Sequence, residues 1–211
     1  MKTISLLLLC SFAGIASAQS REMWFSSGWS QMSNSSVGTD QLTGGSANDL
    51  KLKGGFLFAV RFDVNQGNHI GHEFQYVNSR APLEYTYEGP SQLGAAVNQG
   101  GYNLLGYFNG TESKVRVFGT VGAQLSNFAR PSDSALGCTS ANCTVASQPP
   151  DTGGNSKFGF NYGGGAKFHV TSKFGIRFDV RQYVSGKPFN LPFSSGLLRQ
   201  TEISGGVGVI F

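Results

Sequence analysis

The sequence of 211 residues predicts an all-β fold, a single eight-stranded antiparallel up-and-down transmembrane β-barrel. Three observations support this prediction. Apolar and polar residues alternate in eight segments, which is the period of a β-strand. The connections between these segments are alternately long and short, as in a barrel with tight turns at one end and loops at the other. All seven prolines fall in the long connections, as expected because proline cannot donate to a β-ladder.

The clearest alternation lies between residues 174 and 181. One face carries the apolar row Phe174, Ile176, Phe178 and Val180, and the other carries Arg177, Asp179 and Arg181. Successive side chains of a strand point to opposite faces, so this pattern indicates a strand with one apolar face. The pattern recurs in residues 23–29, 56–64, 72–76, 102–108, 115–125, 157–170 and 203–211, with Phe118 as an exception on a polar face. Beyond residue 18 no helical period of comparable strength appears.

The connections between these segments supply the strand count. The long ones are residues 35–52, 79–97, 129–156 and 185–197, and the short ones are 65–68, 109–113 and 171–173. With both ends of the chain at the short-turn end, eight is the even number of strands that fits. The longest connection contains Cys138 and Cys143, which we expect to form a local disulfide in an exported chain. Half of a metal site is the alternative, but no histidine or second cysteine pair lies nearby.

Residues 1–18 have the three parts of a secretory signal peptide. Lys2 is the positive start, residues 4–15 are mostly apolar, and Ala16-Ser17-Ala18 is a cleavage site with small residues. The apolar run is too short for a spanning helix. Cys10 raises the alternative of a lipoprotein signal, but Leu9 stands before it where a small residue is required. We therefore predict a mature barrel domain of residues 19–211.

Alternation alone does not say which face of each strand looks inward. In a soluble barrel the apolar rows would form the core, whereas in a transmembrane barrel they face lipid and the polar rows line the lumen. The apolar rows are rich in phenylalanine and would overfill an eight-stranded barrel, which has room for one set of modest side chains. The opposite rows mix small residues with charges of both signs. We predict a lumen charge network of Arg61, Asp63, Glu73, Arg116, Lys167, Arg177, Asp179, Arg181 and Glu202.

These features together resemble the small bacterial outer-membrane β-barrel family, the group related to the barrel domain of outer-membrane protein A. The resemblance is carried by the signal peptide, the segment 174–184 and the closing residues 206–211, Gly-Val-Gly-Val-Ile-Phe. It implies an outer-membrane location, contact with outer-membrane lipid and lipopolysaccharide, and insertion by the barrel-assembly machinery. In that family a terminal aromatic residue, with apolar residues at alternate positions before it, is the assembly signal. Val207, Val209 and Phe211 match this signal, and Gly205 interrupts the row that begins at Ile203.

Composition excludes some classes of function. Charged residues make up only 13% of the chain, against about 25% in an ordinary globular domain. The formal net charge of +4 is small and scattered, which argues against a nucleic-acid partner. We expect a monomer without a cofactor and without a metal, because no metal-ligand spacing appears.

The sequence does not predict an enzyme. Some small outer-membrane barrels act on lipids with a histidine or serine beside a carboxylate, but His72 and Glu73 point to opposite faces of one strand. His169 shares the lumen side with Lys167, where a packed polar side chain is the simpler interpretation. We expect a structural or membrane-integrity role. The alternatives are surface adhesion or recognition through the long loops, a narrow pore, and a soluble lipocalin-like barrel.

Overall fold

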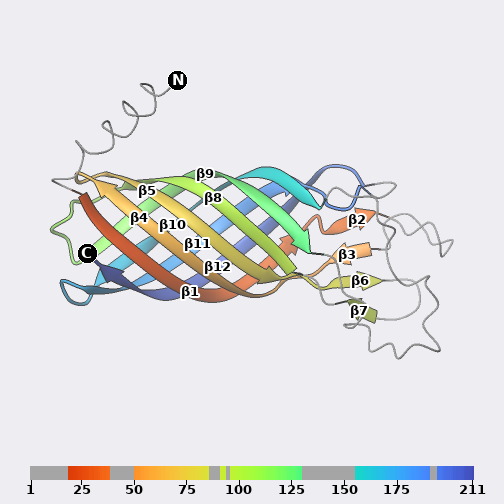
Figure 1. Cartoon of the computed structure of the whole chain (residues 1–211), viewed down its shortest axis with the longest axis horizontal. Coiled ribbons are helices and arrows are strands. Elements are labelled where there is room, and N and C mark those ends of the chain that lie inside the picture. The colour runs from red at the N-terminus through yellow and green to blue at the C-terminus, as the bar shows by residue number, and fades with distance from the viewer. Residues whose placement is uncertain (1–18, 39–49, 86–90, 94–95, 130–154, 191–193) are drawn as a thin grey trace, which may run out of the picture.

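The computed structural model describes residues 19–38, 50–85, 91–93, 96–129, 155–190 and 194–211. Eight long antiparallel strands form a closed barrel, which confirms the predicted fold class (Figure 1). They are β1 (Gln19–Ser33), β4 (Gly55–Gln66), β5 (Ile70–Arg80), β8 (Ala96–Tyr107), β9 (Val115–Ala129), β10 (Ser156–His169), β11 (Phe174–Gly186) and β12 (Leu197–Ile210).

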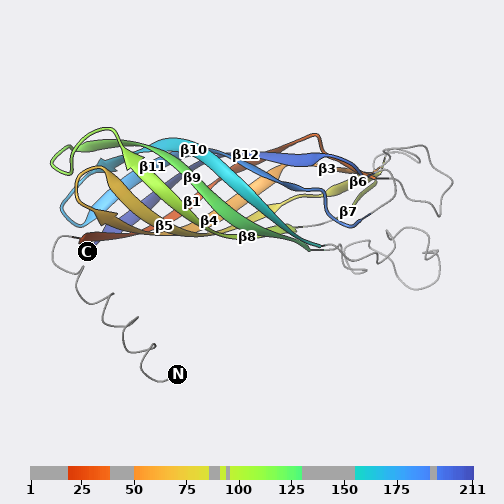
Figure 2. The same ribbon diagram turned by 90° about the horizontal axis from the view of Figure 1, so that it is seen from above.

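The barrel is an up-and-down one. Each long strand pairs with the long strand next to it in the chain, and β1 also pairs with β12, which closes the sheet. The turns between β4 and β5, β8 and β9, and β10 and β11 are short and lie at one end, where the C-terminus also lies (Figure 1). Seen from above, the strand ends that the longer connections join all lie at the opposite end (Figure 2). A transmembrane barrel has this arrangement, with short periplasmic turns and long extracellular loops.

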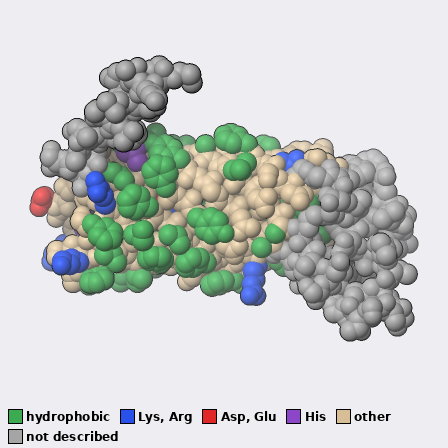
Figure 3. Space-filling view, viewed as in Figure 1, with side chains coloured by type: hydrophobic (Ala, Val, Ile, Leu, Met, Phe, Trp, Pro, Cys, Tyr) green, Lys and Arg blue, Asp and Glu red, His purple; other side chains and the backbone are tan. Residues whose placement is uncertain are grey.

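The outer surface of the barrel is apolar. Large hydrophobic side chains on all eight strands are exposed, among them Trp29 at 58%, Phe74 at 55% and Phe158 at 74%. Figure 3 shows hydrophobic side chains spread over the side of the barrel, with lysine and arginine toward its two ends. The charged rows of the same strands are buried in the lumen. The predicted inversion of the soluble pattern is therefore confirmed.

Two of the predicted long polar connections contain short strands, so the prediction of loops throughout residues 35–52 and 79–97 was wrong. The strands β2 (Ser36–Gly38), β3 (Leu50–Leu52), β6 (Leu83–Tyr85) and β7 (Ser91–Leu93) form a separate four-stranded sheet, the loop-end sheet, beyond the barrel. Their apolar residues pack with residues from the loop ends of the barrel strands. This buried cluster contains Met32, Val37, Leu50, Leu52, Ala81, Leu83, Val97, Phe128, Phe189 and Leu198.

Some sequence predictions fall outside the described residues. The signal peptide, residues 1–18, and the disulfide between Cys138 and Cys143 both do. In the described ranges, β1 begins at Gln19, and β12 begins at Leu197, earlier than the alternation from Ile203 predicted. None of the described residues belongs to a helix that is long and apolar enough to span a membrane.

Two glycines make room for the largest side chain in the lumen. Trp24 on β1 is fully buried and pairs with Gly208 on β12, which in turn pairs with Gly175 on β11. A Cβ atom on Gly208 would lie 2.3 Å from the indole ring of Trp24, and one on Gly175 would lie 2.8 Å from it. The indole therefore occupies the space that side chains at these two positions would need.

We expect Gly208→Val to destabilise the barrel by about 1–3 kcal/mol, because it overpacks a filled interior. Replacing Trp24 with leucine in the same chain should recover part of that loss, since the smaller side chain frees the space. Urea unfolding of the refolded protein in detergent would measure both effects. Equal losses for Gly208→Val with and without the second change would contradict this packing.

Candidate functional site

The lumen is the candidate functional site because it concentrates the buried charge of the chain. All nine charged residues predicted to line it are inside the barrel, each at most 1% exposed. They reach the lumen because they occupy strand positions opposite the lipid-facing rows. Eight of the nine join one cluster of ion pairs, which Glu22 on β1 also enters. The resulting lumen cluster consists of Glu22, Arg61, Asp63, Glu73, Lys167, Arg177, Asp179, Arg181 and Glu202.

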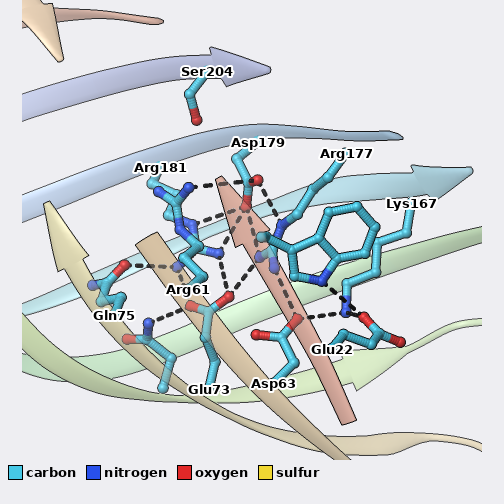
Figure 4. Close-up of polar contacts among 12 residues, drawn as sticks. Glu22, Arg61, Asp63, Glu73, Gln75, Lys167, Arg177, Asp179, Arg181 and Ser204 are labelled. Carbon is cyan, nitrogen blue, oxygen red and sulfur yellow. Dashed lines mark hydrogen bonds and ion pairs between the residues drawn. The ribbon is translucent and has the colours of Figure 1, made fainter. Parts of the chain in front are cut away.

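Arg177 on β11 lies at the centre of the lumen cluster. Its guanidinium donates to Asp63 at 2.8 Å, to Glu73 at 2.5 Å and to Asp179 at 2.7 Å (Figure 4). Arg181 donates to the same Glu73 at 2.6 Å and to Asp179 at 2.7 Å. The two arginines thus share two carboxylates, and the planar guanidinium forks match the carboxylate geometry.

Lys167 on β10 connects the cluster to the opposite wall. Its ammonium donates to Glu22 at 2.5 Å and to Asp63 at 2.6 Å (Figure 4). It also donates to the hydroxyl of Tyr107 at 2.7 Å. Glu22 also accepts from the indole N–H of Trp24 at 2.9 Å. All three donor positions of the ammonium are therefore occupied.

Glu202 on β12 anchors the loop side of the cluster. It accepts from Arg61 at 2.5 Å, from the hydroxyl of Tyr183 at 2.8 Å and from Ser204 at 2.5 Å. Arg61 also lies 4.0 Å from Asp179, which links this group to the centre. A buried carboxylate needs several donors to replace its lost hydration, and this one has three.

Arg116 is the one predicted network residue that lies apart from the lumen cluster. Its guanidinium stacks on the ring of Tyr107 at 3.6 Å from the ring centre and donates to the carbonyl of Asn68 at 3.1 Å. It therefore serves the turn end of the lumen, where a cavity of about 560 Å³ opens beside it and His169. Register places Arg116 beside Lys167 in the ladder, and the direction of its side chain, over Tyr107 and toward the carbonyl of Asn68, separates its guanidinium from the ion pairs of the cluster.

Sequence reasoning missed several polar partners of the cluster. Glu22 and Trp24 are the clearest case, because Met23, Phe25 and Trp29 were recognised as one apolar row of the same strand. The even-numbered positions of β1 then had to face the lumen. Asn103 and Tyr107 lie opposite the apolar row of β8 in the same way, and Asn103 donates to Glu73 at 2.7 Å. Strand parity was the available signal, and it identifies the face without identifying the partner.

Aromatic and aliphatic residues close the lumen on both sides of the cluster. Leu57, Ala59, Val77 and Tyr183 form a buried group toward the loops, and Leu105, Tyr107 and Phe118 form another toward the turns. The guanidinium of Arg177 lies 4.8 Å from the ring centre of Phe118, and Lys167 lies 5.5 Å from that of Trp24. The charges are thus held in a nonpolar surrounding, where their mutual attraction is strong and any unpaired charge is costly.

The three histidines do not gather into one site. His69 lies in the turn after β4 and bonds the carbonyl of Tyr107 at 3.0 Å. His72 lies on the outer surface, 2.6 Å from the hydroxyl of Tyr102, and His169 lies at the turn-end cavity. Within the described ranges, no three His, Cys, Asp or Glu side chains are grouped as metal ligands would be.

Residues 4–211 match the family described as the outer membrane protein β-barrel domain. The chain belongs to this family. Membership supports an outer-membrane location, and it agrees with the apolar outer surface of the barrel. No protein in the curated collection of sequences matches the chain.

Solved structures show the same fold at low sequence identity. Neisserial surface protein A has a TM-score of 0.58 and 17% identity, with 90% of this chain and 96% of that one covered. The outer membrane protein OprG from Pseudomonas aeruginosa has a TM-score of 0.55 and 11% identity, with 92% and 95% covered. The outer membrane protein AlkL has a TM-score of 0.51 and 13% identity, with 92% and 89% covered. At these identities the likeness concerns the fold alone.

We expect Lys167→Met to destabilise the barrel by about 3–5 kcal/mol, because it leaves Glu22 and Asp63 buried without their shared cation. Lys157→Met is the matched control, since among the described residues the amine of Lys157 donates to the neutral side-chain amide oxygen of Asn190 at 2.8 Å and to no carboxylate. Urea unfolding followed by tryptophan fluorescence measures both variants. Comparable stability of the two variants would show that the lumen pairs are not coupled as described.

Proposed function

We propose that this protein is a structural barrel of the outer membrane that stabilises the membrane, does not conduct through its lumen and catalyses no reaction. The observation that carries the proposal is the lumen cluster, in which charged side chains at most 1% exposed are paired with one another across the barrel. An open pore would leave such side chains hydrated and separated by water.

The cluster and its immediate partners come from every wall of the barrel. Six strands carry the charged members, β8 adds Asn103 and Tyr107, and β9 adds Phe118. An eight-stranded barrel has an interior just wide enough for side chains to fill. A hydrated ion that passed through would have to separate several buried ion pairs at once, and each opened pair leaves uncompensated charge.

The contacts of His69, His72 and the lumen carboxylates support a role without catalysis. A nucleophilic catalytic site needs a base within hydrogen-bond reach of the nucleophile, and a third group that orients the base. His72 meets a tyrosine hydroxyl, His69 meets a backbone carbonyl, and the lumen carboxylates are each occupied by cations or hydroxyls. These groups are engaged in packing contacts.

We expect the purified protein to give no steady conductance in a planar lipid bilayer. A charge-neutral quadruple variant, Glu73→Ser, Arg177→Ser, Asp179→Ser and Arg181→Ser, removes two cations and two carboxylates and should open a conducting path. The control keeps the volume and removes the charge, with Glu73→Gln, Arg177→Met, Asp179→Asn and Arg181→Met, and should stay closed. Heat-modifiable gel migration verifies that each variant is folded.

Large, steady channels from the wild-type protein would overturn the proposal, whatever the variants do. If the volume-preserving control conducts although the wild-type protein does not, the pairing of charges closes the lumen, and the volume of the side chains does not.

We also propose that Val207, Val209 and Phe211 form the signal for outer-membrane assembly. Val207 is 62% exposed and Phe211 is 71% exposed on the lipid side, while the amide of Phe211 donates to the carbonyl of Arg21 at 2.9 Å. The terminal residue is therefore anchored by its backbone and leaves its ring accessible. A ring that takes no part in the lumen supports a role in assembly, and it would be recognised in the unfolded chain, before this backbone bond forms.

Removal of Phe211 should lower the amount of folded protein in the outer membrane several-fold, because insertion fails before the barrel closes. Phe108→Ala is the matched control, because Phe108 is exposed at 77% outside the terminal row. Membrane fractionation with heated and unheated gel samples gives the folded fraction. Normal insertion without Phe211, or an equal defect for Phe108→Ala, would remove the signal role.

Surface recognition is the second candidate function, and the loop-end sheet favours it. Its strands stand beyond the barrel, and the apolar cluster around Leu50, Leu52 and Leu83 fixes them to the barrel end. Exposed segments on a rigid scaffold are common sites of binding. Deleting residues 86–90 and testing retention of whole cells on a panel of host surfaces would test this function independently of conductance.

A further inference from the structure

Arg116 on β9 is a buried cation without a neighbouring anion. Its side chain is 1% exposed, and its guanidinium contacts the ring of Tyr107 and the carbonyl of Asn68, neither of which carries a charge. Each of the other buried cations in the described part of the lumen lies 2.5 to 2.8 Å from a carboxylate. A buried charge is costly unless an opposite charge compensates it locally. The lumen cluster therefore does not account for the burial of Arg116.

The overall charge of the lumen accounts for this burial only in part. The lumen cluster holds five carboxylates and four cations, so Arg116 makes the buried charges of the two signs equal in number. A cation that served only this balance would lie among the carboxylates. Arg116 instead pairs with Lys167 in the ladder and directs its guanidinium toward the turns. Its Nε–H group is buried and has no hydrogen-bond partner among the described residues.

Arg116 lines the cavity of about 560 Å³ at the turn end of the lumen, the end at which the C-terminus lies (Figure 1). His169 on β10 lines the same cavity, as do the turns that follow β8 and β10. The Nε2 atom of His169 is buried as well, and in the described ranges it has no partner. An imidazole nitrogen that carries its hydrogen is a donor, as the Nε–H group of an arginine always is. Two unpartnered nitrogen atoms thus belong to the walls of one cavity.

Hydroxyl groups make up much of the remaining lining. They belong to Ser20, Thr111, Ser113, Thr171 and Ser172. The oxygen of Ser20 accepts from the side-chain amide of Asn65 at 3.1 Å, and that of Thr171 accepts from the backbone amide of Phe174 at 3.0 Å. Within the part of the chain that the structure describes, neither of these two hydroxyls donates a hydrogen bond, so both hydrogens are available to a ligand. Such a lining favours a small polar molecule over an acyl chain.

The charges around the cavity match a ligand with one negative charge. Arg116 and Lys114 are positive and Glu112 is negative, and all three line the cavity. Glu22 lines it too, but Lys167 already donates to this carboxylate. One positive charge is left over. A monocarboxylate would compensate it, whereas a dianion such as phosphate would leave an excess of negative charge.

We propose that the turn-end cavity binds a small monocarboxylate with a polar body, such as a hydroxy acid. The carboxylate accepts hydrogen bonds from Arg116 and His169, and the hydroxyl groups of the lining bind the polar part. The short turns of such barrels are periplasmic, so the ligand enters from the periplasm. This binding site goes beyond the proposed structural role and is independent of whether the lumen conducts.

Saturation-transfer NMR of the protein in an uncharged detergent, titrated with lactate, tests the proposal. Lactate should bind saturably to the wild-type protein. Its neutral analogue lactamide should bind at least about tenfold more weakly, because it lacks the charge that compensates Arg116; tenfold corresponds to about 1.4 kcal/mol. This comparison needs no substitution. Equal binding of the two compounds, or no saturable binding of lactate, would overturn the proposal.

The variant Arg116→Met should weaken lactate binding by a similar factor. Lys173→Met is the matched control, since Lys173 is an exposed cation in the turn before β11 and does not line the cavity. Lys114→Met should lose less than Arg116→Met, because Lys114 is exposed and water and salt screen its charge. Equal losses for Arg116→Met and Lys173→Met would reduce the effect to general charge and contradict a specific site. Heat-modifiable gel migration verifies that each variant is folded.

Urea unfolding separates ligand binding from a purely structural role of Arg116. Lactate should raise the urea midpoint of the wild-type protein and of Lys173→Met and leave that of Arg116→Met unchanged, since a ligand stabilises only the state that binds it. If lactate leaves the midpoint of the wild-type protein unchanged, Arg116 is structural only and the proposal fails. Inorganic phosphate is the last probe. Displacement of lactate by an equal concentration of phosphate would show a site for dianions and refute the monocarboxylate assignment.

Discussion

The paired charges around Arg177 are the interaction on which the interior of this barrel depends. The outer surface faces hydrocarbon in the membrane, so the apolar rows on it cannot also form a core. The middle of the lumen holds polar and charged side chains, and these must satisfy one another because little else can reach them. Arg177 does this by meeting Asp63, Glu73 and Asp179 from three strands.

Closure of the barrel and filling of its lumen support each other. The backbone ladder from β1 through β12 leaves no free edge in the barrel, and it sets which side chains face one another across the lumen. The pairs in turn join strands distant in sequence, as Lys167 on β10 does with Glu22 on β1. Glycines at 175 and 208 complete the fit by admitting the indole of Trp24 beside this ammonium. A mutation that affects the backbone ladder, the ion pairs or the two glycine positions therefore disturbs the other two.

The middle of the lumen and the loop end of the barrel differ in composition, and this difference separates the proposed roles. The middle of the lumen is filled, which favours a structural role over transport. The loop end carries an apolar cluster together with a small sheet. Surface recognition would therefore take place outside the lumen. One molecule can combine a lumen that does not conduct with an outer surface that binds a partner. Different rows of side chains on the same strands form the lumen and the outer surface.

The sequence by itself determined the strand count, the alternation of turns and loops, and the inversion of faces. Each of these follows from local information: side-chain parity has a period of two, and proline cannot donate to a ladder. It also identified nine charged residues of the lumen, but not which ones pair. Glu22 was missed and the contacts of Arg116 with Tyr107 and Asn68 were not foreseen, because partners across a lumen depend on register and side-chain direction, which are set only in the closed barrel. The loop-end sheet was missed for a related reason: its strands have three residues each, too few to show a period, and only packing against the barrel end makes them strands.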